Sequence, residues 1–439
     1  MVNNIKFLNI LSKVQQYISE KYSAALTNLD KLSQLKSYIE KYLRDTGYSV
    51  EGMTITELTD SLYSEMAEYS ILTKYLGRED IEEINVNSWN DLAITYTDGS
   101  IKKADEHFYS PQHAIDIVKR LLHHSGMIID NSTPINQGHL PGNTRITAIK
   151  EPVVDKECGI SVSIRLLHPS RVTREQLVSG GNATGRMLDF LCMCLRYGVS
   201  FLVAGATSSG KTTLLNALLS SVPDEKRIFT IESGTRELSL IKNEGGKTIN
   251  NVVHTLSRPS DTEAYDITQE DLLVASLRFN PDIVVVGEIR DFEAHSAVEA
   301  SLTGHTVVST IHASAADAAH TRLALLCQKR FPINFNTSLI QAAQAFPVVI
   351  FEHKLEDNSR KLMDISECVI NGNGEREYRT LFRYNITKNE LIDGKYIIEG
   401  HFEQPSIMSD SLKKKLIQFG APQDVLEEFL TRENEALFK

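Results

Sequence analysis

A glycine-rich stretch followed by lysine and threonine is the part of this sequence whose spacing is most typical of a defined chemistry. The residues GATSSGKT at 205–212 fit the pattern G-x-x-x-x-G-K-[ST]. Glycine lets the backbone turn its N–H groups inward, Lys211 can reach the outer phosphates of a nucleotide, and the Thr212 hydroxyl can bind Mg²⁺. The motif therefore predicts a site for ATP and Mg²⁺ that is formed by Gly205, Ala206, Thr207, Ser208, Ser209, Gly210, Lys211, Thr212 and Thr213.

The runs on either side place this loop at a turn from a strand to a helix. VSFLVA at 199–204 is apolar and β-prone, whereas TLLNALL at 213–219 has helical periodicity. Phosphate groups bind at such turns because the helix N-terminus adds positive potential. A chance glycine-rich turn before a helix is the alternative, and the presence of both flanking elements argues against it.

The sequence around this loop predicts the sheet that must position it. From residue 186 to residue 360, helical segments alternate with short buried runs, which are 199–204, 227–231, 283–286, 306–311 and 347–351. This alternation is typical of an α/β domain, in which helices cover both faces of a parallel sheet.

Polar side chains follow several of these runs. Glu232 follows 227–231, Glu288 follows 283–286 after one glycine, and His312 follows 306–311. In an open parallel sheet, ligands bind beyond the carboxyl ends of the strands. We therefore expect these side chains, together with Glu237, to converge on the phosphate loop.

Each of these side chains has a role that suits phosphoryl transfer. Glu288 is the candidate for orienting or deprotonating the attacking water, and His312 for contacting the γ-phosphate. Glu232 and Glu237 could hold the water shell of Mg²⁺, with Thr212 as the direct ligand, because this ion keeps several waters. Either glutamate could instead be a helix cap or a surface charge.

Cations are also needed to offset the charge that develops on the phosphates. Arg145 and Arg165 lie on predicted strands before the nucleotide-binding segment, and Arg290 follows Glu288 by two residues. Each of the three could instead form an ordinary surface ion pair.

The chain divides into five predicted segments. We expect a helical extension at 1–70, an α+β domain at 71–170, a linker at 171–185, the ATPase domain at 186–360 and a C-terminal extension at 361–439. Residues 1–70 could be an arm that binds a partner or a helical hairpin packed on the next domain. The last segment contains strand-like alternation followed by two predicted helices, at 409–420 and 422–438.

Composition limits the class of protein. The 439 residues carry a formal net charge of -11, which argues against a protein that coats nucleic acid. The five cysteines form no C-x-x-C pair, and no apolar run approaches the roughly 18 to 20 residues that span a bilayer. We expect a cytoplasmic protein that touches membranes only through its partners.

Several ordered motifs resemble those of the type II/IV secretion and type IV pilus assembly ATPases, and most closely the CpaF-like tight-adherence pilus branch. The resemblance covers roughly residues 75 to 435. Its motifs are DIEEINVN at 80–87, GNTR at 142–145, VSIR at 162–165, the phosphate loop, LRFNPD at 277–282, VGEIR at 286–290, TGH at 303–305 and TIHA at 310–313. One motif departs, because ESGTREL at 232–238 has Ser233 where the family has an aspartate.

The resemblance implies a RecA-like motor domain preceded by a PAS-like α+β domain, in a ring that is a homohexamer. ATP would bind between the two domains of each subunit, and Arg145 and Arg165 would contact its phosphates. Hydrolysis would drive an inner-membrane platform protein that assembles a pilus or exports a protein. A conjugation or type IV secretion DNA-transfer ATPase, and a nucleotide-gated scaffold without hydrolysis, remain as alternatives.

Overall fold

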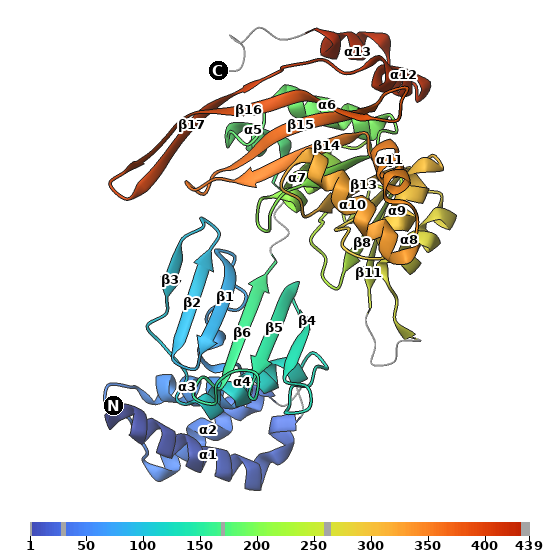
Figure 1. Ribbon diagram of the computed structural model, residues 1–439. Helices are drawn as coiled ribbons and strands as arrows, with labels where there is room; N and C mark the ends of the chain where they lie inside the picture. Colours follow the sequence, from blue (N-terminus) through green and yellow to red (C-terminus); the bar gives the residue numbers. More distant parts are fainter. Residues whose placement is uncertain (1, 28–31, 168–171, 259–264, 432–439) are drawn as a thin grey trace. The chain divides into compact units, whose positions relative to one another are not determined.

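The computed structural model describes residues 2–27, 32–167, 172–258 and 265–431 (Figure 1). The chain divides into two compact units, Met1–His168 and Pro169–Lys439, and each unit is described by itself. Within the described residues, no helix combines the length and the apolar character needed to cross a bilayer.

Three helices begin the first unit, as the sequence predicts for this region. They are α1 (Val2–Thr27), α2 (Leu32–Thr46) and α3 (Ile55–Ala67). Thr54 caps α3, because its hydroxyl accepts the N–H of Glu57 and the Glu57 carboxylate returns to the Thr54 N–H. The helices share a small core of Val14, Ile18, Leu35, Ile39, Leu43, Leu58 and Leu62.

A six-stranded antiparallel sheet forms the rest of the first unit, in the order β3-β2-β1-β6-β5-β4. Alternate residues of β5 and β6 are buried, and they share a core with helix α4, which Ser110 caps. The α+β class predicted for this region is therefore confirmed. The elements are β1 (Ile81–Ser88), β2 (Asp91–Tyr96), β3 (Ile101–Lys103), α4 (Pro111–His123), β4 (Ile135–Leu140), β5 (Thr144–Lys150) and β6 (Ile160–Leu166), preceded by the short helix η2 (Ser70–Leu72).

The second unit contains a nine-stranded sheet in the order β11-β8-β12-β13-β7-β14-β15-β16-β17. The first six strands in this order are parallel, and the last three continue the same sheet antiparallel to their neighbours. The strands are β7 (Phe201–Ala204), β8 (Ile228–Ser233), β11 (Val252–Ser257), β12 (Ile283–Val286), β13 (Thr306–Ile311), β14 (Val348–Lys354), β15 (Arg360–Ile370), β16 (Arg376–Ile392) and β17 (Lys395–Glu403). A separate two-stranded hairpin joins β9 (Asn243–Glu244) to β10 (Lys247–Thr248).

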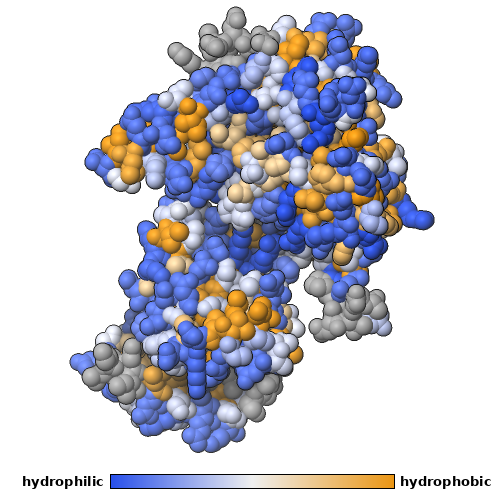
Figure 2. All heavy atoms as spheres, in the orientation of Figure 1, coloured by the Kyte–Doolittle hydropathy of each residue, from blue (hydrophilic) through white to orange (hydrophobic). Residues whose placement is uncertain are grey.

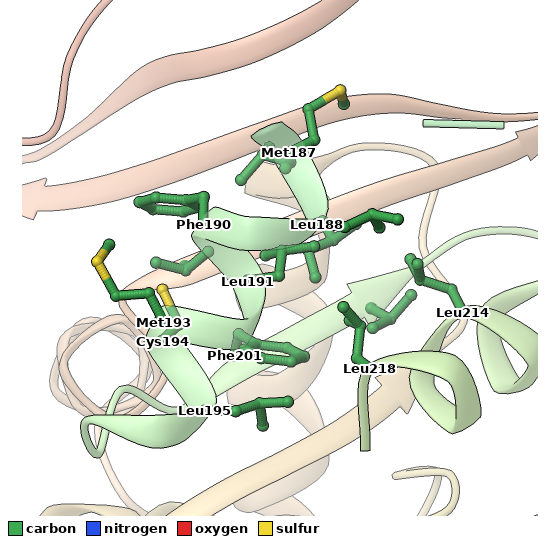
Figure 3. Packing of buried hydrophobic residues seen from close by; sticks show 14 of the residues in the cluster. Met187, Leu188, Phe190, Leu191, Met193, Cys194, Leu195, Phe201, Leu214 and Leu218 are labelled. Atoms are coloured by element: carbon green, nitrogen blue, oxygen red, sulfur yellow. The ribbon is translucent and has the colours of Figure 1, made fainter. Parts of the chain in front are cut away.

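Helices cover both faces of this sheet, which confirms the predicted RecA-like α/β class. Successive residues of β7 point to opposite faces, so Phe201 and Leu202 belong to different apolar clusters. Figure 3 shows the first cluster, in which Phe190 and Leu191 of α6 lie near Phe201 of β7 and Leu218 of α7. The helices are α5 (Arg174–Ser179), α6 (Gly185–Arg196), α7 (Lys211–Ser220), α8 (Gln269–Ser276), η4 (Leu277–Phe279), α9 (Glu293–Leu302), α10 (Ala316–Arg330), α11 (Phe335–Ala345), α12 (Asp410–Gln418) and α13 (Gln423–Leu430).

Two predicted segments differ in detail from the structure. The stretch 171–185, predicted as a linker, contains α5, which Thr173 caps. The predicted helix at 409–420 is present as α12 with Ser409 as its cap, whereas α13 ends at Leu430 and residues 432–439 lie outside the described part of the chain.

The hairpin of β16 and β17 extends well beyond the other strands (Figure 1). Apolar side chains are exposed along it, and Figure 2 shows hydrophobic surface in this region. These side chains are Ile386, Leu391, Ile392, Tyr396 and Ile397.

Candidate functional site

The phosphate loop joins the end of β7 to the start of α7. Gly210 has φ 109°, in the left-handed region where a side chain would be strained, and it stands at the N-cap position of α7. Among the residues that the structure describes, no side-chain hydrogen bond caps the N-terminus of this helix. The Ser209 hydroxyl is buried and has no hydrogen-bond partner among the described residues. These features fit a phosphate group.

Lys211 is folded back into its own loop. Only 7% of the residue is exposed, and its Nζ donates to the carbonyl oxygens of Gly205 at 3.1 Å and Ala206 at 2.7 Å. Ala206 and Thr207 are exposed at the crest of the loop. The ammonium group therefore lies where an incoming phosphate can exchange for the two carbonyls.

Thr212 lies in the first turn of α7 and is half-buried. In the described ranges, no three or more His, Cys, Asp or Glu residues form a group that could hold a metal ion. The Thr212 hydroxyl would hold a Mg²⁺ ion at this loop together with phosphate oxygens and water, which are the ligands that Mg²⁺ usually takes in nucleotide sites.

Glu288 and His312 lie together beyond the ends of β12 and β13. His312 Nε2 is 3.2 Å from Glu288 Oε1, and Arg290 Nη1 is 3.9 Å from the other carboxylate oxygen. The Thr310 hydroxyl donates to the Gly287 carbonyl at 2.7 Å, which ties the two strand ends together. The side chain predicted to orient water and the one predicted to contact phosphate are thus neighbours.

Arg290 also reaches the end of β8. Its Nη2 donates to the Ser233 hydroxyl at 2.6 Å, while its backbone N–H donates to the Glu293 carboxylate at 2.6 Å. Ser233 is the residue at which the acidic motif departs from the family pattern. The serine therefore serves as the acceptor for an arginine that lies beside Glu288.

The Glu232 side chain accepts hydrogen bonds from the backbone of a nearby loop, which its position in the sequence does not indicate. Its Oε1 accepts the backbone N–H groups of Glu237 at 2.7 Å and Leu238 at 3.0 Å. Burial raises the pKa of Glu232 to about 7, although these two hydrogen bonds act in the opposite direction. Its Oε2 is buried, accepts no hydrogen bond from the described residues, and lies 3.9 Å from His254 Nδ1. The other oxygen, Oε1, thus holds the loop after β8.

The remaining predicted arginines lie in the first unit. Arg145 on β5 and Arg165 on β6 are directly paired across the sheet, so their side chains leave from the same face. Arg165 Nη2 is 3.8 Å from Glu82 Oε1, and the side chain is about one-third exposed. Their predicted contact with phosphate stays a prediction.

Two further residues contact the phosphate loop and were not predicted. Glu352 follows the apolar run of β14, and Arg360 begins β15, where its Nε donates to the Ser208 carbonyl at 3.1 Å. The rule that identified Glu288 and His312 also applies to Glu352, because it follows the buried apolar run of a parallel strand. Arg360 lies on an antiparallel strand, and no sequence rule we applied selects it.

Comparisons with known proteins identify relatives among secretion proteins. The chain is 28% identical over 323 residues to the type IV secretion system protein PtlH of Bordetella pertussis, covering 67% of this chain and 92% of PtlH. It is 36% identical over 200 residues to the uncharacterized protein MJ0900 of Methanocaldococcus jannaschii, covering 45% of this chain but only 34% of that protein.

Solved structures are also similar, including that of the ATPase DotB from Legionella pneumophila. That structure has a TM-score of 0.47 and 16% identity, over 81% of this chain and 85% of DotB. A family model described as "Type II/IV secretion system protein" matches residues 66–382, well over half of the chain. The protein therefore belongs to the type II/IV secretion system protein family.

Proposed function

We propose that this protein is an ATPase whose hydrolysis of ATP powers protein secretion or the assembly of a type IV pilus of the tight-adherence kind. The observation that carries the proposal is the meeting of Glu288 with His312, 3.2 Å apart, at the end of the sheet that also carries the phosphate loop. A water-orienting carboxylate and a phosphate cradle on one rigid sheet are the parts that phosphoryl transfer requires.

The chemistry follows from the positions of these groups. Lys211 exchanges its two loop carbonyls for phosphate oxygens, and the N–H groups at the start of α7 bind the same phosphates. The Thr212 hydroxyl would hold Mg²⁺, and the ion would neutralise part of the phosphate charge. Glu288 orients the attacking water and accepts its proton, His312 contacts the γ-phosphate beside it, and Arg290 lies 3.9 Å from the carboxylate.

Two arginine side chains of the first unit would complete the nucleotide site. Arg145 and Arg165 are proposed to contact the phosphates, in a homohexamer that binds ATP between the two domains of each subunit. Their position on the same face of adjacent strands would let them act as a pair. Closure of the domains around ATP and their release after hydrolysis would then produce the mechanical motion.

The proposed partner is an inner-membrane platform protein of a secretion or pilus machine. The name of PtlH, a type IV secretion system protein, supports a role in secretion. The protein would be cytoplasmic and reach the membrane through this partner. The net charge of -11 supports a protein partner over direct binding of nucleic acid.

Hydrolysis of ATP by the purified chain tests this proposal. Phosphate release should require Mg²⁺ and should be unchanged by single-stranded or double-stranded DNA. Strong stimulation by DNA would favour a DNA-transfer ATPase. Binding of ATP without hydrolysis, alone and with membranes of the source cell, would favour a nucleotide-gated scaffold.

A further inference from the structure

Glu352 is a buried carboxyl group against the phosphate loop, and its position has a mechanistic consequence. β14 lies parallel to β7, with Phe351 opposite Ala204, so Glu352 falls beside Gly205 at the start of the loop. Only 3% of Glu352 is exposed. The loop is therefore supported from one side by the end of the neighbouring strand.

This one residue lies against both glycines of the motif. The Glu352 carbonyl oxygen fills the space that a side chain on Gly205 would need. A Cβ atom on Gly210 would lie 2.6 Å from Glu352 Oε1 and 3.1 Å from Arg360 Cδ. The backbone and the carboxyl group of Glu352 thus set how closely the loop packs against β14.

The charges around the carboxyl group come from two sides. Lys211 of α7 and Arg360 of β15 are the charged groups that act on it, and Arg360 also holds the loop through the Ser208 carbonyl. Even so, Glu352 Oε2 is buried and accepts no hydrogen bond from any residue that the structure describes. An ionised carboxylate in this position would be poorly compensated.

We propose that Glu352 is a positioning residue of the nucleotide site, which supports the phosphate loop at Gly210 and is protonated when phosphate groups occupy the loop. This inference rests on the proposed function, because it assumes that the loop binds a nucleotide. The proton comes from solvent, and no bond in the nucleotide changes.

The reason is electrostatic. Phosphate bound at Lys211 brings several negative charges close to a buried carboxyl group, and like charges in a medium of low polarity repel strongly. A proton removes this repulsion. Burial already raises the pKa of Glu352 to about 8, against the opposing effects of Lys211 and Arg360, and a bound anion would raise it further.

Calorimetric titration of the full-length protein with ADP, at pH values from about 7 to about 9, tests the inference. E352Q mimics the neutral carboxyl group, so its Kd should match that of the wild type at pH 7. At pH 9 the wild type should bind about tenfold more weakly than E352Q, because one pH unit above a pKa of about 8 leaves roughly a tenth of the carboxyl groups protonated. E356Q, which removes an exposed carboxylate from the adjacent turn, should behave as the wild type.

The variant R360M tests the inference independently, because it should change the pH dependence of the Kd in a defined direction. Removing this cation should raise the pKa of Glu352 further, so the gap between R360M and the double variant R360M/E352Q at pH 9 should be smaller than tenfold. Wild-type binding should also take up protons near pH 8.5, and E356Q should take up the same number, when heats are compared in buffers of different ionisation enthalpy. This proton measurement needs no variant at position 352.

Failure of the inference about Glu352 and failure of the proposed function would give different results. A constant ratio of the Kd values of wild type and E352Q across the pH range, or no proton uptake by the wild type, would overturn the role of Glu352 and leave the nucleotide site intact. Failure of the wild type to bind ADP or ATP at any pH would instead contradict the proposed function.

Discussion

Arg290 donates a hydrogen bond from Nη2 to the Ser233 hydroxyl at 2.6 Å, and this bond joins the ends of β12 and β8. The same guanidinium lies 3.9 Å from Glu288. A serine at position 233 thus accepts from the arginine without adding a second negative charge beside the proposed catalytic carboxylate.

S233A removes this acceptor and should leave Arg290 less well fixed. Because the guanidinium is 45% exposed, we expect the loss to be about 1 kcal/mol, which is roughly a fivefold decrease in kcat, with KM for ATP within about twofold. Steady-state ATP hydrolysis measures both constants. S411A, an exposed serine on α12, is the control, and equal kcat values in the two variants would remove the proposed role of Ser233.

K211A should weaken nucleotide binding. The Lys211 ammonium group would donate charge-assisted hydrogen bonds to phosphate oxygens, and a bond of this kind contributes about 1.5 to 3 kcal/mol. Its loss should therefore raise the Kd for ATP about 10- to 100-fold. Titration with a fluorescent ATP analogue measures this change. K414A on the exposed face of α12 should bind as the wild type does, and unchanged affinity in K211A would refute the assigned role.

The buried Glu232 predicts a pH-dependent stability. Its folded-state pKa of about 7 lies above that of an unfolded glutamate, so the folded protein binds more protons between about pH 4.5 and pH 7. Stability is therefore lost as pH rises through this window. E232Q keeps an oxygen for the Glu237 and Leu238 N–H groups and should be up to about 3 kcal/mol more stable at pH 8, but equal to the wild type at pH 4.5.

Denaturant unfolding of E232Q and wild type at the two pH values measures this difference. E244Q, which removes an exposed carboxylate on β9, serves as the control. A difference between E232Q and wild type that is independent of pH would contradict the prediction.

R145A and R165A should lower turnover while leaving the fold intact. Each arginine is proposed to stabilise charge in the transition state, an effect for which one lost donor typically costs about 10²- to 10³-fold in kcat. Circular dichroism and kcat for ATP report stability and turnover separately. Full activity in both single variants would exclude the arginine proposal.

Much of the parallel sheet could be predicted from local sequence. The buried runs at 283–286 and 306–311 coincide with β12 and β13, because strands covered on both faces are continuously apolar and stand out from their surroundings. β11 was not predicted, since it lies at the edge of the sheet and its residues are mostly half-buried. Such a strand has no continuous apolar run to detect.

The proximity of candidate residues was predictable where a polar side chain directly follows a strand. Glu288 and His312 were selected in this way and lie 3.2 Å apart, while their roles in hydrolysis stay predictions. The paired hydrogen bonds of Glu232 depend on the path of the loop after β8, and the bond from Arg360 to Ser208 joins residues 152 positions apart. Contacts of this kind arise from tertiary packing, so spacing in the sequence does not reveal them.

The measurement that tests the central claim most directly is Mg²⁺-dependent ATP hydrolysis by the wild type and E288Q, across a wide range of protein concentrations. The wild type should hydrolyse ATP only with Mg²⁺, with a specific activity that rises as the ring assembles, and E288Q should bind ATP normally but turn over about 10²- to 10⁴-fold more slowly. No hydrolysis by the wild type at any concentration, or equal turnover by E288Q, would contradict the account.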